Sequence, residues 1–387
     1  VRIRRGIFQG DSLSPLIFIM AMMPLTTILN KTRLGYMMDN DKIRINHLLF
    51  MDDLKLYGKT AAQLDSLVNS VHLFSKDIGM EFGIDKCAVI QMKRGKLESS
   101  DGLQLPDGSK VPALETKDTY KYLGILQNES VRNKQTKDII RKEYYRRTRK
   151  ILQSKLNAGN IFKAINARAV SMVRYGAGIV DWYKHELETI DRRTRKLLTL
   201  HGAFHPKSSI ERLYMKRKDG GRGLLNIHDT VDLEKASLGY YVSKSTEEML
   251  QLASRREVVG DNQNPIEKSR KQIEERRARF SEKKLHSVFF RITEDVSDEK
   301  VSWMWMRNGY LKKNTEATIV AAQEQSIRTR AISSKIDKSG ISPLCRVCGK
   351  RDETISHLLT ECGVLANSEY KTRHDGVAAI VHWGLCR

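Results

Sequence analysis

The chain has 387 residues, with 68 Lys and Arg against 46 Asp and Glu, which gives a net charge of +22. This length allows two or three domains with buried cores, and so large an excess of positive charge indicates a polyanionic partner such as nucleic acid. Five cysteines are too few for a disulfide framework and indicate a reducing compartment. The apolar run 16–23 is too short to span a bilayer and precedes no small-residue cleavage site, so we expect neither secretion nor membrane insertion.

The first predicted element is a helix from Pro15 to about Asn30, because proline favours a first helical turn. Apolar side chains surround its axis almost completely, so we expect it to be buried beneath a sheet. Pro24 should kink this helix or remove one of its hydrogen bonds. Before the helix lies Gln9-Gly10, where glycine lets a backbone approach a ligand closely, although a plain turn is an equal explanation.

Two adjacent carboxylates, Asp52 and Asp53, lie between the short apolar runs 48–51 and 54–57. Such runs around two turn-tolerant residues predict a β-hairpin with the Asp pair at its tip. A bare Asp-Asp is most often only a solvated turn. A hairpin tip is nevertheless a rigid, exposed place for carboxylates that hold divalent cations, which phosphoryl transfer requires for positioning and charge neutralisation.

A second helix is predicted over 61–77, where apolar residues form one stripe between a capping Thr60 and a terminating Gly79. Strands are expected near 87–92 and 120–126. This order predicts an α+β fold, in which an antiparallel sheet carries helices on one face.

A basic helix is predicted over 136–156, because apolar residues keep helical spacing on one face. Its other face carries Lys137, Arg141, Lys142, Arg146, Arg147, Arg149 and Lys150. Charge of one sign on one face predicts contact with nucleic acid phosphates, with a solvated helix as the alternative. Further helices are expected near 162–180 and 184–200, and the highly charged stretch 267–284 should form an exposed helix or linker.

Near the end of the chain, Cys345, Cys348, His357 and Cys362 have the spacing C-x2-C-x8-H-x4-C. Zinc prefers four such ligands in a tetrahedron, so the spacing predicts a structural zinc knuckle. The fourth ligand stays open between Cys362 and its neighbours His374, His382 and Cys386. So small a unit has little core, and the metal should therefore supply much of its folding energy.

Four segments together resemble the later palm motifs of a reverse transcriptase: Gly6–Pro15, Leu48–Tyr57, Gly79–Cys87 and Tyr120–Ile125. The chain is similar to the reverse transcriptases of non-LTR (LINE-like) retrotransposons, in the group with a C-terminal zinc knuckle and a restriction-like endonuclease. The resemblance implies a partial palm over 1–130, a helical thumb over 131–260, a helical linker over 261–340 and a CCHC zinc knuckle over 341–387. It further implies an RNA-directed DNA polymerase that acts in the nucleus after synthesis in the cytoplasm, with an RNA template, a DNA primer and deoxynucleotides as partners.

The same resemblance assigns roles to individual residues. Asp52 and Asp53 would hold magnesium, Lys86 would contact the pyrophosphate leaving group, Gln9 and Gly10 would shape the nucleotide pocket, Met51 would pack under the primer end, and Tyr122, Leu123 and Gly124 would grip the primer. The alternatives are a surface lysine for Lys86 and an ordinary buried strand for Tyr122–Gly124.

Two-metal catalysis also needs an Asp from an earlier palm strand. In the family that strand and the fingers precede the first motif found here, so we expect residues 1–387 alone not to polymerise. Two other interpretations remain open. One is a protein similar to group II intron maturases, and the other is a relic or domesticated copy that binds nucleic acid without catalysis. The sequence does not reveal the oligomeric state.

Overall fold

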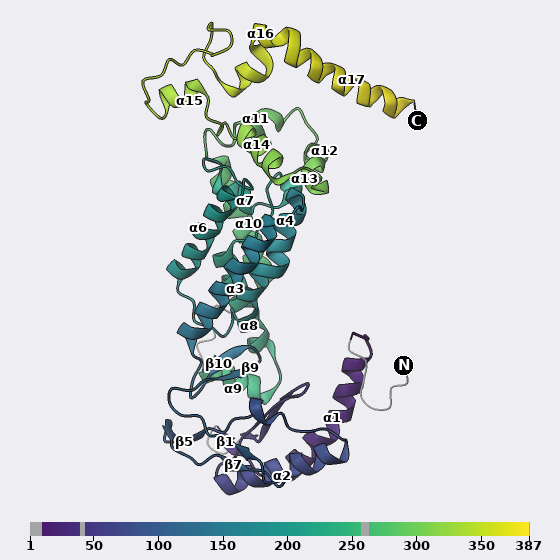
Figure 1. Ribbon diagram of the computed structural model, residues 1–387, viewed down its shortest axis with the longest axis vertical. Coiled ribbons are helices and arrows are strands. Elements are labelled where there is room, and N and C mark those ends of the chain that lie inside the picture. Colours follow the sequence, from purple (N-terminus) through teal and green to yellow (C-terminus); the bar gives the residue numbers. More distant parts are fainter. Residues whose placement is uncertain (1–9, 39–42, 257–262, 387) are drawn as a thin grey trace. The chain divides into compact units, whose positions relative to one another are not determined.

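The computed structural model describes residues 10–38, 43–256 and 263–386 (Figure 1). The chain forms two compact units, each assembled from separate segments. Unit 1 comprises Val1–Ile140, Gly176–Asp181 and Glu234–Asn264, and unit 2 comprises Arg141–Tyr175, Trp182–Leu233 and Pro265–Arg387. Each of these units combines segments that are separated in the sequence, whereas the expected palm, thumb, linker and knuckle follow one another along the chain. The expected domain boundaries at residues 130, 260 and 340 therefore stay a prediction.

Unit 1 combines helices with short strands. Its helical elements are α1 (Ser14–Lys31), α2 (Ala61–Asp77), the 3-10 turn η1 (Ile84–Lys86), the first turns of α3 (Asn133–Gln153), the later part of α8 (Ile227–Lys244), and α9 (Glu248–Arg256). Its strands are β1 (Tyr36–Met38), β2 (Ile43–Ile45), β3 (His47–Phe50), β4 (Asp53–Leu56), β5 (Gln91–Lys93), β6 (Lys96–Glu98), β7 (Leu103–Gln104), β8 (Lys110–Val111), β9 (Tyr120–Tyr122) and β10 (Ile125–Gln127).

Within the described residues these strands pair as five separate antiparallel hairpins. The mixed helix and strand class is therefore confirmed, but the single antiparallel sheet expected for the palm is not formed. The strands are two to four residues long, and each pairs only with its neighbour across a turn. Two strands expected from the sequence are also wrong: 87–92 contains only the first two residues of β5, and 120–126 folds back on itself as β9 and β10.

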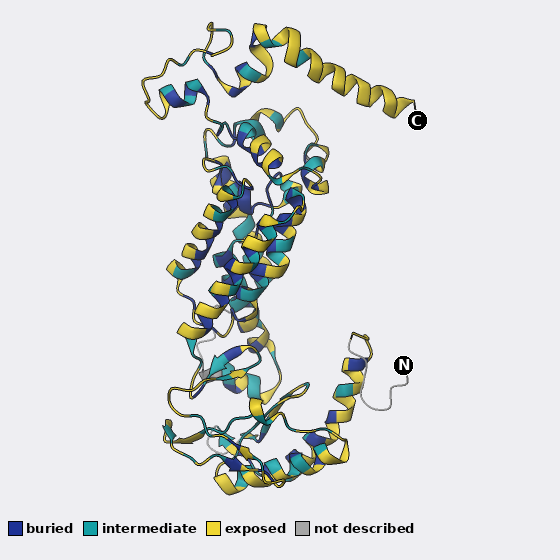
Figure 2. Ribbon diagram, in the orientation of Figure 1, coloured by how far each residue is buried: buried dark blue, intermediate teal, exposed yellow. Residues whose placement is uncertain are grey.

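The first helix packs with one face only. Met22, Leu25 and Leu29 of α1 form a buried cluster with Leu67, Val71 and Phe74 of α2. The opposite face stays open (Figure 2), since Leu16, Ile19, Met20 and Met23 are between 45% and 60% exposed. The prediction of a helix buried on all sides is thus wrong within the described residues. By length and composition, α1 is also long and apolar enough to cross a membrane. The core helix of a soluble protein can meet the same criterion of length and hydropathy.

The second helix agrees with its prediction in position and in its buried face. It runs from Ala61 to Asp77, and the Thr60 hydroxyl caps it by accepting a hydrogen bond from the Gln63 amide at 3.3 Å. Gly79 follows the helix with φ +73°, a conformation that favours glycine. One side of α2 packs on α1, and the residues Leu64 and Val68 pack on the small cluster around β7 and β8.

Within the described residues unit 2 is helical. Its elements are the remainder of α3, α4 (Ala158–Ala164), η2 (Ile165–Val170), α5 (Ser171–Tyr175), α6 (Lys184–Leu200), α7 (Ile210–Tyr214), η3 (Arg217–Asp219), the start of α8, α10 (Pro265–Ser281), α11 (Val288–Thr293), α12 (Glu299–Ser302), α13 (Met304–Asn308), α14 (Lys313–Gln323), α15 (Arg330–Lys335), η4 (His357–Glu361), α16 (Gly363–Leu365), η5 (Ala366–Tyr370) and α17 (Lys371–Leu385). Helix α6 has the predicted limits. Helix α10 is more than an exposed linker, because Arg276 and Phe280 are buried against the rest of the unit.

A buried ionic cluster joins α14 to the segment that follows α7. The carboxylate of Glu316, which is fully buried, accepts hydrogen bonds from the Arg222 Nε and the Arg217 Nη2 at 2.6 Å each. Arg212 is fully buried too and lies 3.8 Å from the buried Glu324. Gly221 is required beside this cluster, because a Cβ there would come within 2.2 Å of the Met215 carbonyl oxygen.

Candidate functional site

Strands β3 and β4 form the aspartate hairpin, residues 47–56. Phe50 pairs with Asp53, so Met51 and Asp52 are the two residues of the turn. Met51 has φ +55°, a left-handed conformation that is uncommon outside glycine and is typical of tight hairpin turns. Asp52 lies in the turn and Asp53 begins β4, so the hairpin forms as predicted but its turn lies one residue earlier than the expected Asp52-Asp53 turn. Both side chains are exposed.

The core holds this hairpin from one side. Leu49, Leu54 and Leu56 pack against the cluster formed by α1 and α2. Because side chains alternate along a strand, Asp53 and Lys55 share the opposite face of β4. The tip therefore rests on packed elements while its carboxylates stay in solvent, and within the described residues neither Asp52 nor Asp53 forms an ion pair or a side-chain hydrogen bond.

Strands β9 and β10 form the tyrosine hairpin, residues 120–127, which lies beside the aspartate hairpin. Lys55 Nζ donates a hydrogen bond to Gln127 Oε1 at 3.3 Å and lies 5.4 Å from the centre of the Tyr122 ring. Burial raises the pKa of Tyr122, and the nearby Asp53 carboxylate raises it further. Sequence reasoning did not single out Lys55, and its place in an apolar-polar alternation gave no sign of this contact.

The predicted primer-grip residues lie at the end of β9 and in the turn of the tyrosine hairpin. Tyr122 pairs with Ile125, so Leu123 and Gly124 form the turn, with φ +45° and +81°. Glycine suits the second position because it adopts positive φ without strain. Leu123 and Gly124 are therefore not part of an ordinary buried strand, whereas Tyr122 is the last residue of β9.

Lys86 ends η1 and is exposed, and its side chain has no partner among the described residues. Burial raises the pKa of Tyr120 in the tyrosine hairpin, and the charges of the Cys87 thiol and the Asp53 carboxylate raise it further. Cys87 follows Lys86, so residues of two other motif segments act electrostatically on Tyr120. Lys86 belongs to one of them, and its contact with a leaving group stays a prediction.

The fourth segment is only partly described. Gln9 lies outside the described residues. Gly10 has φ +98°, and nothing among the described residues lies within 4 Å of a Cβ built there. Glycine at this position therefore satisfies the backbone conformation, and crowding does not explain it.

The described residues do not bring a third acid to the aspartate hairpin. A group of three or more ligating side chains is found at one place in the described part of the chain, and that place is the Cys/His cluster. Asp52 and Asp53 fit a magnesium ion as exposed oxygen donors, but they supply only part of a two-metal site.

The basic helix α3 presents fewer free charges than its sequence indicates. Lys137 is only 5% exposed, so its assignment to the exposed face is wrong. The Arg146 and Arg147 guanidinium groups each lie 2.6 Å from Glu143, and Arg141 lies 3.6 Å from Glu186.

Lys142, Arg149 and Lys150 are exposed, and no hydrogen bond or ion pair of their side chains is found in the described part of the chain. These three residues are the best placed of the predicted set to meet a phosphate backbone. The helix predicted to reach residue 156 ends at Gln153, and Leu156 beyond it is 42% exposed.

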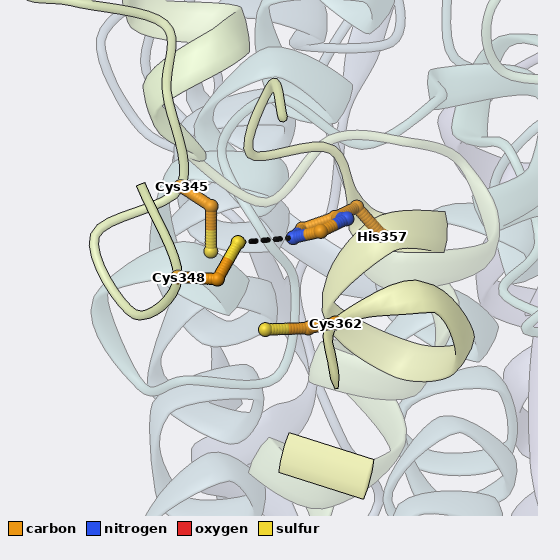
Figure 3. Close-up of side chains that lie close together, drawn as sticks. All are labelled: Cys345, Cys348, His357 and Cys362. Carbon is orange, nitrogen blue, oxygen red and sulfur yellow. Dashed lines mark hydrogen bonds between the residues drawn. The ribbon is translucent and has the colours of Figure 1, made fainter. Parts of the chain in front are cut away.

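The predicted zinc ligands converge (Figure 3). One ligand atom from each of Cys345, Cys348, His357 and Cys362 lies within 4.8 Å of all the others. Cys348 Sγ and His357 Nε2 are 3.3 Å apart, and the other two thiols are buried. Tetrahedral zinc with Zn–S bonds of about 2.3 Å needs ligand atoms nearly this close, so the donor set fits zinc. Cys362 completes this group of four, and His374, His382 and Cys386 are outside it.

The cluster also favours thiolate at Cys348. The backbone amide of Lys350 and then the His357 side chain help to lower the pKa of Cys348 to about 6. A thiolate is the form that binds metal. Two residues that sequence reasoning missed contact the ligand segments: Glu353, which is fully buried, and Tyr370. Single polar residues without a motif give no signal in a sequence.

Comparison with known proteins agrees with this arrangement. Residues 2–126 match the family model described as reverse transcriptase (RNA-dependent DNA polymerase). The chain is 31% identical over 125 residues to the Pol polyprotein of the type-2 retrotransposable element R2DM of Drosophila melanogaster, which covers 31% of this chain and 12% of that protein. It is 26% identical over 237 residues to an R2 element polyprotein of Popillia japonica, which covers 59% of this chain and 37% of that protein.

A further relative is an R2 element polyprotein of Nasonia vitripennis, 29% identical over 134 residues, which covers 33% of this chain and 13% of that protein. The chain thus spans well under half the length of each of these relatives. The matched region contains both the aspartate hairpin and most of the tyrosine hairpin. Residues 2–126 are therefore similar to the reverse transcriptase family, and the three relatives described above are Pol polyproteins of R2 retrotransposable elements.

Proposed function

We propose that this chain is part of an RNA-directed DNA polymerase of a non-LTR retrotransposon, which extends a DNA primer on an RNA template. The observation that carries the proposal is the proximity of the aspartate hairpin to the tyrosine hairpin, where Lys55 Nζ lies 3.3 Å from Gln127 Oε1 and 5.4 Å from the centre of the Tyr122 ring. A polymerase needs metal-binding acids beside the primer end, and these two hairpins offer both parts.

Asp52 and Asp53 would hold magnesium from the tip of their hairpin, with at least one further carboxylate completing the site. Magnesium, when bound, would neutralise charge on the nucleotide phosphates. Met51, Tyr122, Leu123 and Gly124 would position the primer end, Gln9 and Gly10 would line the nucleotide pocket, and Lys86 would contact the leaving pyrophosphate. A lysine suits the last role because its compact charge attracts phosphate oxygens.

Helix α3 would contact the template–primer duplex through Lys142, Arg149 and Lys150, since phosphate contacts need exposed and unpaired cations. The four-ligand cluster would bind a structural zinc ion. The protein would act in the nucleus, where target DNA lies.

Primer extension tests the proposal. The chain is joined to the upstream part of a reverse transcriptase domain from an R2 polyprotein and is supplied with RNA template, DNA primer, deoxynucleotides and magnesium. Asp52→Asn removes a metal-binding charge and should lower kcat by about 100-fold or more. The matched control is Asp65→Asn, an exposed acid on α2, which should leave the rate unchanged.

Equal rates for Asp52→Asn and the unsubstituted protein would remove Asp52 from the mechanism. Residues 1–387 alone should bind nucleic acid without extending a primer, because the described residues offer only two acids at the hairpin. Extension by this chain alone would contradict that expectation. Binding without extension by the joined protein would favour the relic interpretation, while the three R2 relatives favour a retrotransposon enzyme over a maturase.

A further inference from the structure

The four candidate zinc ligands come from two separate segments of the chain. The covalent structure alone does not bring these segments together. Cys345 and Cys348 lie in a turn, closed by the Gly349 amide, which donates to the Cys345 carbonyl oxygen at 2.8 Å. His357 begins the π-helical turn η4, and Cys362 follows its end. Other residues must therefore hold each segment in the arrangement that binds metal.

Tyr370 holds the second segment through its hydroxyl group. The Cys362 amide donates to the Tyr370 Oη at 3.0 Å, and this oxygen lies 3.1 Å from each of the carbonyl oxygens of His357 and Leu358. A phenol carries one hydrogen, so it accepts from Cys362 and donates to one carbonyl at a time. The hydroxyl thus bridges backbone groups of the two ligands His357 and Cys362.

The Tyr370 ring is itself fixed from a neighbouring position. The Arg373 guanidinium lies 5.2 Å from the centre of the ring, within the range of a cation–π contact. Tyr370 ends η5, which directly follows α16 after Cys362. The hydroxyl is therefore presented by the helical segment that follows Cys362.

Glu353 holds the first segment through its carboxylate. This group is fully buried and accepts hydrogen bonds from the Arg346 amide at 3.0 Å and from the Arg346 guanidinium at 2.7 and 2.6 Å. Arg346 lies between Cys345 and Cys348, so these bonds fix the turn that carries both thiols. The same carboxylate accepts the Arg330 amide at 2.9 Å, which ties the turn to the start of α15.

We propose that Tyr370 and Glu353 are positioning residues of the zinc site, which hold the two ligand segments in place and thereby set the affinity for zinc. This inference rests on the zinc site proposed above. Residues that support metal ligands commonly change metal affinity by 10- to 100-fold when they are substituted, because the ligands must then be ordered at the moment of binding. Neither residue donates an atom to the metal, so the number of bound ions should not change.

The test is zinc binding by the full chain, measured by competition with a chromophoric chelator after the metal has been removed. Tyr370→Phe keeps the ring and removes only the hydroxyl, and Glu353→Gln keeps the shape and removes the charge. Each variant should bind one zinc ion with a dissociation constant 10- to 100-fold higher than that of the unsubstituted chain. The matched controls are Tyr310→Phe, whose side chain is 80% exposed, and Glu274→Gln, an exposed residue of α10.

Cobalt binding separates positioning from a merely structural role. At saturating Co²⁺, each variant should show the ligand-field absorption spectrum of the unsubstituted chain, because the same four ligands are used once the ion is bound. A dissociation constant equal to that of the controls would overturn the inference. An altered cobalt spectrum, or failure to bind at any concentration with loss of helical circular dichroism, would overturn it as well, because the residue would then be needed for ligand identity or folding. If the unsubstituted chain itself binds no zinc, the proposed zinc site fails first.

Discussion

Asp191 on α6 shows how a single buried residue can control stability through its proton. Its side chain is almost wholly buried and accepts hydrogen bonds from the amides of Ile227 and His228 at 3.0 and 3.3 Å, which cap the start of α8. The Tyr214 hydroxyl also donates to it, at 3.3 Å. Burial outweighs these bonds and raises the pKa of Asp191 to about 6.

This shift predicts a pH dependence with a definite sign. Between about pH 4 and 6 the folded chain holds a proton on Asp191 that the unfolded chain has lost, so this group adds stability as the pH falls. From pH 7 to pH 5 the gain should be about 1 kcal/mol, and Asp191→Asn should lack it. Urea unfolding at the two pH values measures the difference. The control is Asp295→Asn, an exposed acid, and a pH-independent difference between Asp191→Asn and the unsubstituted chain would contradict the prediction.

At the residue scale, the charged side chains of the candidate active site differ from those of the core in their exposure to solvent. Asp52 and Asp53 are exposed and Arg222 and Glu316 are fully buried, yet all four appear in the sequence simply as charged residues. Buried charges are tolerated only when they are paired and hydrogen-bonded, as Arg222 and Glu316 are.

At the scale of elements, the basic helix α3 divides its cations between internal ion pairs and free positions. Arg146 is held by Glu143 through two hydrogen bonds of 2.6 Å each. Arg149, one turn further along, is exposed and has no partner among the described residues. A phosphate must compete with Glu143 for the first residue but not for the second.

Duplex binding by the single variants Arg149→Gln and Arg146→Gln should therefore differ. Loss of one phosphate contact reduces the slope of log K against log salt by about 0.9, which is expected for Arg149→Gln and not for Arg146→Gln. Fluorescence anisotropy with a labelled duplex over a range of salt concentrations measures both slopes. Equal slopes for the two variants would show that pairing with Glu143 does not decide which cation meets the nucleic acid.

At the scale of the whole molecule, the zinc knuckle should depend on metal while the rest of the fold does not. The helical core of unit 2 buries clusters such as Trp303, Met306 and Val320, whereas every residue described in α17 is exposed. A segment with so little apolar core needs the metal for its stability.

Chelation therefore should unfold residues 341–386 locally and leave the remaining helices intact. Hydrogen exchange of the chain with and without a strong zinc chelator measures this segment by segment. Protection should fall around Cys345–Cys362 and stay unchanged in α6 and α14. Unchanged protection in the knuckle would mean that its hydrogen bonds suffice without metal.

Local sequence signals predicted the elements that depend on local physics. Helix α2 has its predicted limits because its apolar stripe, its Thr60 cap and its terminal Gly79 agree. The aspartate hairpin and the convergence of the four candidate zinc ligands were likewise predicted, because each depends on a few residues that lie close together in the chain. The single sheet and the fully buried first helix were wrong, because both depend on which surfaces meet.

The sequence alone determined the chemistry of this protein: its positive charge, its paired acids, its four candidate metal ligands and its similarity to reverse transcriptases. Only the tertiary structure decided which of these groups are available, by burying Lys137, pairing Arg146 with Glu143 and bringing Lys55 beside Tyr122. The physical reason is that side-chain chemistry and local spacing are properties of each residue and its neighbours in the sequence. Burial and partnership instead arise between segments that are distant along the chain.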